Sequence, residues 1–534
     1  MVNRLQWGLL RAFYRLACRQ AIRPRSVLLL PSHAPGVDNN LTGLTEPLTA
    51  LGWSVRNLAA TRPATAISAE TRSAPTKWQR LRQPARTATQ ISADIATSAP
   101  TKRPSPWPPS PAVTADQKAP CPWPETISRR SRRQAPWPLM TTARALWLMA
   151  RSAVTVIDDH LPMLNPINPR AGSRLIQAWH GLGAFKRVGY TRPTDQGGPA
   201  RSSGAHQHYT AALVSGSTVR QAYAASFGLP VERVQALGAP RTDRLFNRSA
   251  RAADQASVWS RWPDLRGRRI ITIAPTFRGR GRRGAHYPSA WLNLEVLATA
   301  LSPNDRLILH QHPFIGPWPT QRQALPEQVI DLTGKIDPNA LLAVTNLLVT
   351  DYSSIIFDFA LLIRAELSER SESAIRWTTD TTNGTAANGR QTAGDAGRGG
   401  QETVGPATRG SGGESGDDNL GGETGRVDLG VDRRHVDQRG DREAPSAQVI
   451  PPRSLVLYQP DADSYLANRG FYRPMAAYAF GPQVTDLPAL IEAIRHPSPP
   501  DQTVLEDLWA GDLNACDGLS TGRLIALITG SQPS

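Results

Sequence analysis

Short apolar runs alternate with helical stretches along most of this chain, and this alternation narrows the possible folds more than any other feature. Gly, Pro, Asp and Ser bound the runs, and helical stretches such as 217–227 and 484–495 lie between several of them. Such alternation predicts an α/β protein with parallel sheets of the doubly wound kind, in two groups, one before about residue 245 and one after about residue 268. The runs expected to form buried strands are 26–32, 154–159, 174–180, 211–217, 269–275, 306–313, 346–351 and 454–460.

Two segments do not follow this pattern. Residues 60–140 are rich in Pro, Ser, Thr, Ala and Arg, and the passage at 64–77 returns in altered form at 88–102. Residues 365–450 are a low-complexity stretch rich in Gly, Thr, Asp and Arg without Lys, Phe or Tyr. Such compositions bury little apolar surface, so both segments are expected to be long disordered insertions.

The chain is basic, with a net charge of +17, and the charge is concentrated near its start. Residues 1–140 hold 20 Lys and Arg against 6 Asp and Glu. This imbalance indicates an anionic partner, which can be nucleic acid, anionic lipid or a phosphate polymer, although a solvated stretch would show the same balance. Residues 3–20 combine leucines at helical spacing with arginines, which predicts a helix lying on an anionic membrane surface. An ordinary helix packed on the domain is the alternative.

Cysteine spacing and hydropathy bear on the compartment. Cys18, Cys121 and Cys516 are far apart and match no metal or redox spacing, which fits a reducing compartment. Apolar runs fall short of the roughly 18 residues that span a bilayer. We therefore expect a cytoplasmic protein without a cleaved signal peptide.

Four passages with chemically useful side chains fall at the ends of expected strands, where open parallel sheets bind ligands. In the fourth passage, Ser353 and Ser354 open a helix whose free amide groups can bind phosphate oxygens, and Asp358 lies one turn further. The passages are QAWHGLGAFKRVG (177–189), IAPTFRGRGRR (273–283), LHQHPF (309–314) and VTDYSSIIFDFA (349–360).

These passages resemble, in order, the motifs of the CDP-glycerol glycerophosphotransferase family, the teichoic acid glycerol-phosphate polymerase and primase type. DNNLTGLTEPL (38–48), LGAPRTDRLF (237–246) and PDADSYLANRGFY (460–472) resemble further family passages. The resemblance covers roughly residues 26–58, 141–364 and 452–497. It departs from the family where Leu182 and Gly183 replace Thr–Pro, and where His310 replaces an arginine.

The resemblance implies a GT-B type glycosyltransferase arrangement of the two Rossmann-like domains. A basic amphipathic segment would span 1–25, an acceptor-side domain 26–245 and a donor-side domain 246–534. The implied reaction is attack by a terminal hydroxyl of a teichoic-acid-type acceptor on the β-phosphorus of CDP-glycerol, with release of CMP. It requires a base for the hydroxyl and stabilisation of phosphate charge.

Site roles follow from the same resemblance. His180 is assigned as general base, and His312 is placed on the donor phosphate to neutralise charge on the departing CMP. Asp358 is expected to bind a donor hydroxyl. The remaining residues assigned to substrate binding are Gly181, Lys186, Arg241, Pro275, Thr276, His310, Ser353 and Ser354.

The expected partners are CDP-glycerol, a lipid-linked polyol-phosphate acceptor and an anionic membrane surface, which places the enzyme peripherally on the cytoplasmic face of the cell membrane. We expect no nucleic acid partner, cofactor or obligatory metal. The alternatives are a transferase of the same fold using CDP-ribitol or another nucleotide-activated donor, an epimerase of that fold, an inactive family member and a nucleic-acid binder. The last would leave the His and Ser–Ser passages unexplained.

Overall fold

The computed structural model describes residues 4–32, 40–58, 139–279, 284–312, 314–318, 325–388 and 453–531. It divides into two compact units, one of residues 1–368 with 452–534 and the other of residues 369–451. The expected Pro-rich insertion at 60–140 lies outside the described residues except for its last two positions. Residues 389–450 of the second expected insertion also lie outside them.

The first sheet has six parallel strands in the order β2-β1-β3-β4-β5-β6. Its chain order reverses between β1 and β3, which creates a switch point at their carboxyl ends. The strands are β1 (Arg23–Leu30), β2 (Ser54–Asn57), β3 (Ser152–Ile157), β4 (Arg174–Ala178), β5 (Ala211–Val214) and β6 (Val234–Ala236).

The second sheet is also six-stranded and parallel, in the order β12-β11-β10-β7-β8-β9. Here the order reverses between β7 and β10. Two such sheets confirm the predicted pair of Rossmann-like regions. The strands are β7 (Arg269–Ile273), β8 (Asp305–Leu309), β9 (Val329–Asp331), β10 (Leu347–Thr350), β11 (Ser454–Tyr458) and β12 (Gln483–Val484).

All eight strands predicted from apolar runs are present, and the four that were missed are the edge strands of the two sheets. β2 and β6 form the edges of the first sheet, and β9 and β12 those of the second. An edge strand pairs on one side only and can be short, so its sequence carries a weak apolar signal.

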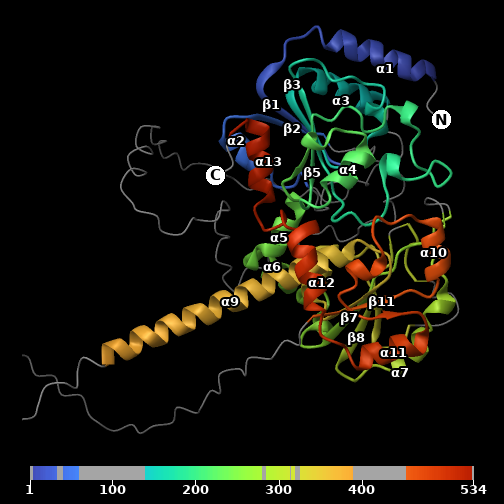
Figure 1. The fold of residues 1–534 in the computed structure, drawn as a ribbon, viewed down its shortest axis with the longest axis vertical. Coiled ribbons are helices and arrows are strands. Elements are labelled where there is room, and N and C mark those ends of the chain that lie inside the picture. Colours follow the sequence, from blue (N-terminus) through green and yellow to red (C-terminus); the bar gives the residue numbers. More distant parts are fainter. Residues whose placement is uncertain are drawn as a thin grey trace, which may run out of the picture. The chain divides into compact units, whose positions relative to one another are not determined.

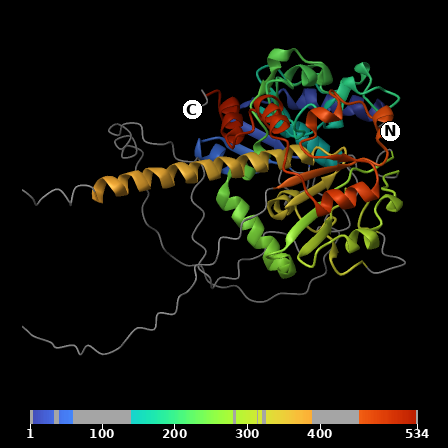
Figure 2. The same cartoon turned by 60° about the horizontal axis from the view of Figure 1, so that its bottom comes forward.

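Helices cover both faces of each sheet (Figures 1 and 2). Several begin at a capping side chain, as where Asp486 accepts a hydrogen bond from the Ala489 amide. The helix α4 ends at Gly228 in the left-handed conformation that glycine adopts readily. The helices are α1 (Arg4–Ala17), α2 (Thr45–Ala50), α3 (Leu139–Arg151), α4 (Arg220–Phe227), α5 (Asp243–Phe246), α6 (Arg248–Arg261), α7 (Leu294–Thr299), α8 (Pro338–Val344), α9 (Ile355–Asn388), α10 (Ala462–Asn468), α11 (Leu487–Arg495), α12 (Gln502–Asp507) and α13 (Ser520–Thr529).

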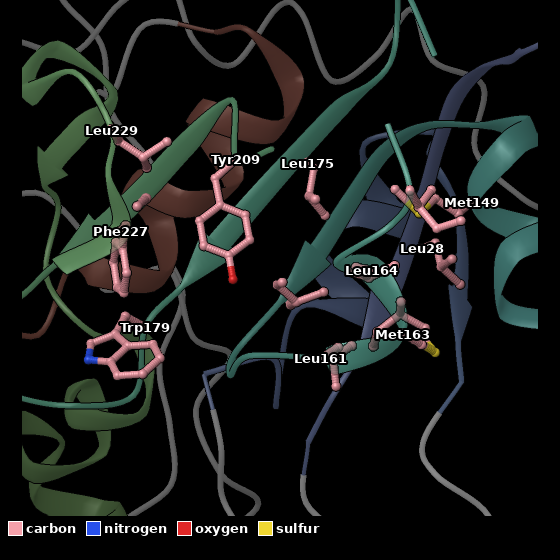
Figure 3. Packing of buried hydrophobic residues seen from close by; sticks show 14 of the residues in the cluster. Leu28, Met149, Leu161, Met163, Leu164, Leu175, Trp179, Tyr209, Phe227 and Leu229 are labelled. Carbon is pink, nitrogen blue, oxygen red and sulfur yellow. The ribbon is translucent and has the colours of Figure 1, made fainter. Parts of the chain in front are cut away.

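The alternation of side chains along β1 shows how the first sheet buries both faces. Leu28 and Leu30 join a core cluster with α3 and α4, part of which is shown in Figure 3. Val27 and Leu29 join a different cluster that includes Leu524 of α13. Because successive strand residues point to opposite faces, a strand covered on both sides is apolar throughout, as the sequence predicted.

The C-terminal helix α13 returns to the first sheet. Leu524 and Ile528 pack there, and Arg174 of β4 donates hydrogen bonds to the carbonyls of Leu527 and Ile528. The expected division assigned all residues from 246 to 534 to the donor-side domain. The helix α13 instead packs on the first sheet, which was expected to be the acceptor side. The sequence could not show this, because α13 is amphipathic and fits either sheet.

The N-terminal helix α1 packs on α3 through Leu10, Tyr14 and Ala17. This contact agrees with the alternative of a helix packed on the domain. Leu9 and Leu16 are nevertheless 65% and 55% exposed, so part of the apolar pattern faces outward.

The helix α9 changes the expected start of the second insertion. It runs from Ile355 to Asn388 and therefore continues well beyond residue 365, where the low-complexity stretch was expected to begin. Ala365 is buried, and Glu366 forms an ion pair with Arg453 at 2.7 Å. The expectation of a disordered insertion that begins at residue 365 is thus wrong for its first residues. The helix that starts after Ser353 and Ser354 continues past residue 365.

Candidate functional site

The sequence-predicted site residues follow the carboxyl ends of strands on both sheets. His180 follows β4, whereas Pro275 and Thr276 follow β7, and Ser353 and Ser354 follow β10. β7 and β10 are the two strands that flank the switch point of the second sheet. In open α/β sheets, ligands bind beyond the carboxyl ends at such a point.

His180 is held by the main chain of the neighbouring strand. Its Nδ1 lies 3.0 Å from the carbonyl oxygen of Asp158, just after β3. A carbonyl can only accept, so Nδ1 carries the proton in the neutral ring and Nε2 keeps its lone pair. His180 is therefore oriented as a proton acceptor. Sequence reasoning did not identify Asp158 as its partner.

The glycines after His180 allow close packing of this turn. Gly183 has a φ of 61°, and a Cβ at this position would lie 2.5 Å from the Phe357 ring of α9. A Cβ at Gly181 would lie 2.7 Å from the Trp179 indole nitrogen. The turn that follows His180 therefore packs directly against the second sheet's helix, and larger residues would push it away.

Arg241 and Asp358 form an ion pair, with Nη1 of Arg241 2.5 Å from Oδ1 of Asp358 and Nη2 3.3 Å from Oδ2. Arg241 Nε also donates to the His180 carbonyl at 3.2 Å. Burial alone would lower the pKa of Arg241, but the Asp358 carboxylate raises it above its usual value. Both carboxylate oxygens of Asp358 accept hydrogen bonds from Arg241, so the geometry favours a role for Asp358 in holding the Arg241 side chain in place. Its binding of a donor hydroxyl stays a prediction.

Asn40 joins the same network and was not singled out from the sequence. Its Nδ2 donates to the carbonyls of Ala178 and Trp179, each at 2.8 Å, and its Oδ1 accepts from the Arg241 amide at 3.0 Å. It is fully buried. Because the oxygen and the nitrogen of the Asn40 side-chain amide are both hydrogen-bonded to main-chain groups, this side chain holds the backbone after β4 next to the backbone of Arg241. The DNNLTGLTEPL passage contained this residue, but only its resemblance to the family pointed to it.

His312 has the opposite tautomer to His180. Its Nδ1 accepts a hydrogen bond from the Phe314 amide at 3.1 Å, so the proton of the neutral ring lies on Nε2. Burial, and then the charges of Lys186 and His310, lower the pKa of His312 to about 4. The ring is therefore neutral near pH 7 and offers an N–H donor rather than a positive charge.

His310 lies next to His312 at the end of β8. Burial lowers its pKa, and its Nδ1 is buried without a hydrogen-bond partner among the described residues. Thr276 is similar, since its Oγ1 is buried and has no partner in the described part of the chain. Buried polar atoms without a partner are uncommon in proteins, and both of these follow strands of the second sheet at its carboxyl edge.

Lys186 lies where the loop after β4 meets the segment after α10. It pairs with Phe471 in an isolated antiparallel bridge, and its Nζ lies 5.6 Å from the centre of the Tyr465 ring. Burial lowers the pKa of Lys186 to about 7; Asp351 opposes this shift, while Arg469, Arg278 and Arg192 add to it. A lysine that loses its proton this readily gains charge when an anion binds beside it.

Arg278 of the IAPTFR passage is a structural residue. It donates to both carboxylate oxygens of Asp461, at 2.6 and 2.7 Å, and to Oδ2 of Asp351 at 2.9 Å. Asp351 also accepts from the Thr276 amide at 2.8 Å. This buried network ties the ends of β7, β10 and β11 together. The sequence did not predict it, because its members lie far apart along the chain.

The start of α9 leaves polar groups at the surface of the site. Ser353 Oγ accepts from the Ile355 amide at 3.4 Å, and Ser354 is exposed. Pro275 is buried beside this region. Within the described residues, no group of three or more His, Cys, Asp or Glu side chains could hold a metal ion. The expectation of a metal-independent site stays a prediction.

Comparison with known proteins gives sequence matches over much of the described part of the chain. Residues 117–365 match the family described as CDP-Glycerol:Poly(glycerophosphate) glycerophosphotransferase. A teichoic acid poly(ribitol-phosphate) polymerase of Bacillus spizizenii is 37% identical over 213 residues, which cover 40% of this chain and 34% of that protein. The ribitol-phosphate polymerase TarK of Staphylococcus aureus is 35% identical over 218 residues, covering 41% and 42%. A glycerol-phosphate primase of Bacillus subtilis is 24% identical over 226 residues, covering 41% and 56%.

The fold has a solved counterpart in the wall teichoic acid polymerase TagF, with a TM-score of 0.56 and 13% identity, covering 99% of this chain and 98% of that chain. The two parallel sheets thus match the GT-B type fold of that chain. The family match over residues 117–365 and these relatives confirm the resemblance seen in the sequence. The matches of this chain span 34% and 42% of the length of the first two relatives named above.

Proposed function

We propose that this protein transfers a polyol-phosphate unit from a CDP-polyol to a teichoic-acid-type acceptor and releases CMP. The observation that carries the proposal is the opposite protonation of two strand-end histidines. His180 offers a lone pair on Nε2, and His312 offers a proton on Nε2. A hydroxyl nucleophile needs a lone pair to take its proton, which His180 supplies. A departing phosphate is stabilised by a hydrogen-bond donor, which His312 supplies.

In the proposed reaction, His180 Nε2 accepts the proton of the acceptor's terminal hydroxyl. The hydroxyl oxygen then forms a bond to the β-phosphorus, and the bond between that phosphorus and the CMP oxygen breaks. Asp158 keeps the His180 ring in the required tautomer, and Arg241 holds the His180 main chain. Because the ring is fixed before substrate arrives, little ordering remains for the reaction itself.

The donor phosphates are proposed to lie at the second sheet's switch point. There the start of α9 at Ser353 and Ser354 supplies amide groups, and Lys186 supplies a positive charge. His312 donates a hydrogen bond to the leaving phosphate, a role that suits its neutral ring better than charge neutralisation. Pro275, Thr276 and His310 line the same edge. Under this proposal the first sheet carries the acceptor side and the second the donor side.

Two donors, CDP-glycerol and CDP-ribitol, are consistent with the family. The description of the matching family supports glycerol. The relatives at 31 to 37% identity are named for ribitol phosphate, whereas those named for glycerol phosphate are 23 to 25% identical. This difference supports CDP-ribitol as a second candidate.

The proposed place of action is the cytoplasmic face of the cell membrane, where a lipid-linked acceptor would be met. The exposed Leu9 and Leu16 of α1 support it, together with the exposed Arg11 and Arg15 on that helix and Arg19 just after it. Among the helices that the structure describes, none combines the length and apolar character needed to cross a membrane.

The test follows CMP release by the purified full chain with CDP-glycerol or CDP-ribitol and a primed polyol-phosphate acceptor. We expect turnover with one donor and its loss in His180→Ala, while His286→Ala, which changes an exposed histidine of another loop, keeps wild-type turnover. CMP release from neither donor would refute the proposal. A His180→Ala variant that retains about a tenth of the wild-type turnover would exclude His180 as the base.

A further inference from the structure

A cavity of about 210 Å³ opens at the amino ends of β1, β2 and β3. The strands of the first sheet are parallel, so this edge is opposite to the one that carries His180. Three arginines and three serines supply its polar lining: Arg23, Arg56, Arg151, Ser26, Ser54 and Ser152. Nothing in the proposed transfer uses these residues.

Strand register and helix packing bring this lining together. Ser26 pairs with Ser54 on β2, and Arg23 pairs with Ser152 on β3. Arg56 lies two residues after Ser54 and so points to the same face of the sheet. The last turn of α3 covers that face and adds Arg151. The lining residues of the cavity therefore belong to regular elements, which fix the positions of their backbone.

The described part of the chain supplies no carboxylate that pairs with the three arginines. The Nε of Arg151 is buried without a hydrogen-bond partner there, and its guanidinium lies 5.4 Å from the Trp147 ring centre. Arg23 and Arg56 are exposed and Arg151 is partly buried, so the three positive charges face one partly open space and attract an anion to it.

We propose that this cavity binds a phosphate ester. Guanidinium groups match the geometry of phosphate oxygens in paired hydrogen bonds. The Ser26 and Ser152 hydroxyls donate to the carbonyls of Arg23 and Leu148, so Ser54 is the serine whose hydroxyl can donate to the same oxygens. The proposal does not depend on the transfer reaction, because the cavity and the catalytic residues lie at opposite edges of the sheet.

The phosphate can come from a lipid headgroup or from a soluble phosphate ester. Position favours the headgroup, because Trp147 contacts both the cavity and Phe13 of α1, with ring centres 6.3 Å apart. The outer side of α1 exposes Leu9 and Leu16. A membrane that received those leucines would bring its headgroups near the cavity.

The first measurement is calorimetric titration of inorganic phosphate into the full chain. We compare the wild type with Arg151→Gln and with Arg144→Gln, which removes the same charge from an exposed position of the same helix outside the cavity. We expect Arg151→Gln to weaken one phosphate-binding step about tenfold or more, and Arg144→Gln to leave it unchanged. Circular dichroism checks folding, and Arg56→Gln on the edge strand β2 replaces Arg151→Gln if that variant unfolds.

The second measurement distinguishes the two sources by cosedimentation with vesicles of phosphatidylcholine, with and without phosphatidylglycerol. If Arg151→Gln loses the phosphatidylglycerol-dependent binding that Arg144→Gln keeps, the cavity binds a lipid headgroup. If vesicle binding is equal but the phosphate step is lost, the ligand is a soluble phosphate ester. Equal phosphate binding and equal vesicle binding in both variants would overturn the proposal.

Discussion

Arg241 places two guanidinium nitrogens on the two carboxylate oxygens of Asp358, and so links the loop after β6 in the first sheet with α9 on the second. The two side chains are 18% and 11% exposed, so solvent screens the pair only in part. Through its Nε, Arg241 also reaches the carbonyl of His180. The position of the proposed base therefore depends on an ion pair between residues 117 positions apart.

Replacing Asp358 by Asn should disturb this arrangement without changing the size of the side chain. We expect turnover to fall by about tenfold or more, because Arg241 loses its fixed partner and small displacements of a reacting group are costly. The measurement is kcat and KM for CMP release beside thermal stability. Asp517→Asn, which breaks the Arg523–Asp517 pair elsewhere on the surface, is the control. Equal loss of turnover in both variants would show that the effect is general destabilisation.

Lys186 should make donor binding depend on pH near neutrality. Its lowered pKa, about 7, means that the free enzyme loses this charge as pH rises through 7. The charged form binds phosphate better, so affinity for the CDP-polyol should be high below pH 7 and should fall above it. Calorimetric Kd values from pH 6 to pH 9, about one unit apart, would measure this.

The matched comparison for this pH dependence is Lys186→Gln against Lys335→Gln. Lys335 lies in the loop between β9 and α8, and its Nζ donates a hydrogen bond to the Asp331 carbonyl. Lys186→Gln should bind the donor weakly at every pH, with a flat profile, whereas Lys335→Gln should keep the wild-type profile. A profile unchanged by Lys186→Gln would assign the titration to another group.

How far the sequence predicted the fold depended on where each strand lies. Interior strands such as β3 and β10 are buried on both faces and are mostly apolar, so their runs were plain in the sequence. The edge strands β2 and β12 include exposed residues and were missed. Sequence periodicity therefore identified the interiors of both sheets but not their widths.

The candidate site was predictable in its parts and not in its connections. The passages around His180, Thr276 and Ser353 do lie at carboxyl ends of strands, as expected. The sequence could not show that Asp358 pairs with Arg241, nor that the Asp158 carbonyl fixes the His180 tautomer. Both contacts join residues that only the sheet order brings together. Asn40 was missed as an individual residue for the same reason.

The outward leucines of α1 should contribute to membrane attachment. We expect the pair of changes Leu9→Gln and Leu16→Gln to reduce cosedimentation with anionic vesicles several-fold, since each removes exposed apolar surface that could enter the interface. The control pair is Leu466→Gln with Leu519→Gln, which are 42% and 50% exposed on other elements. If both pairs reduce vesicle binding equally, α1 is not the attachment site.

The ion pair between Glu366 and Arg453 predicts where the low-complexity stretch can be removed. Arg453 also donates to the carbonyl of Leu342 at 2.9 Å and to that of Ala343 at 3.1 Å, so it fastens the start of β11 to the end of α8. Glu366 accepts hydrogen bonds from Nε and Nη2 of Arg453 and balances the buried charge of that arginine.

Removing residues 372–450 would keep the Glu366–Arg453 pair, whereas removing 365–451 would delete Glu366 and the buried Ala365. We expect the longer deletion to cost roughly 3 kcal/mol more in unfolding free energy, since it leaves an arginine buried without its partner. Urea denaturation of the two deletion variants, joined by the same short Gly–Ser linker, would measure the difference, and loop length itself would contribute little. Glu366→Gln in the full chain isolates the ion pair, and it should reproduce much of that loss. If this variant and the longer deletion were as stable as the shorter one, the pair would have no role in holding α9 to β11.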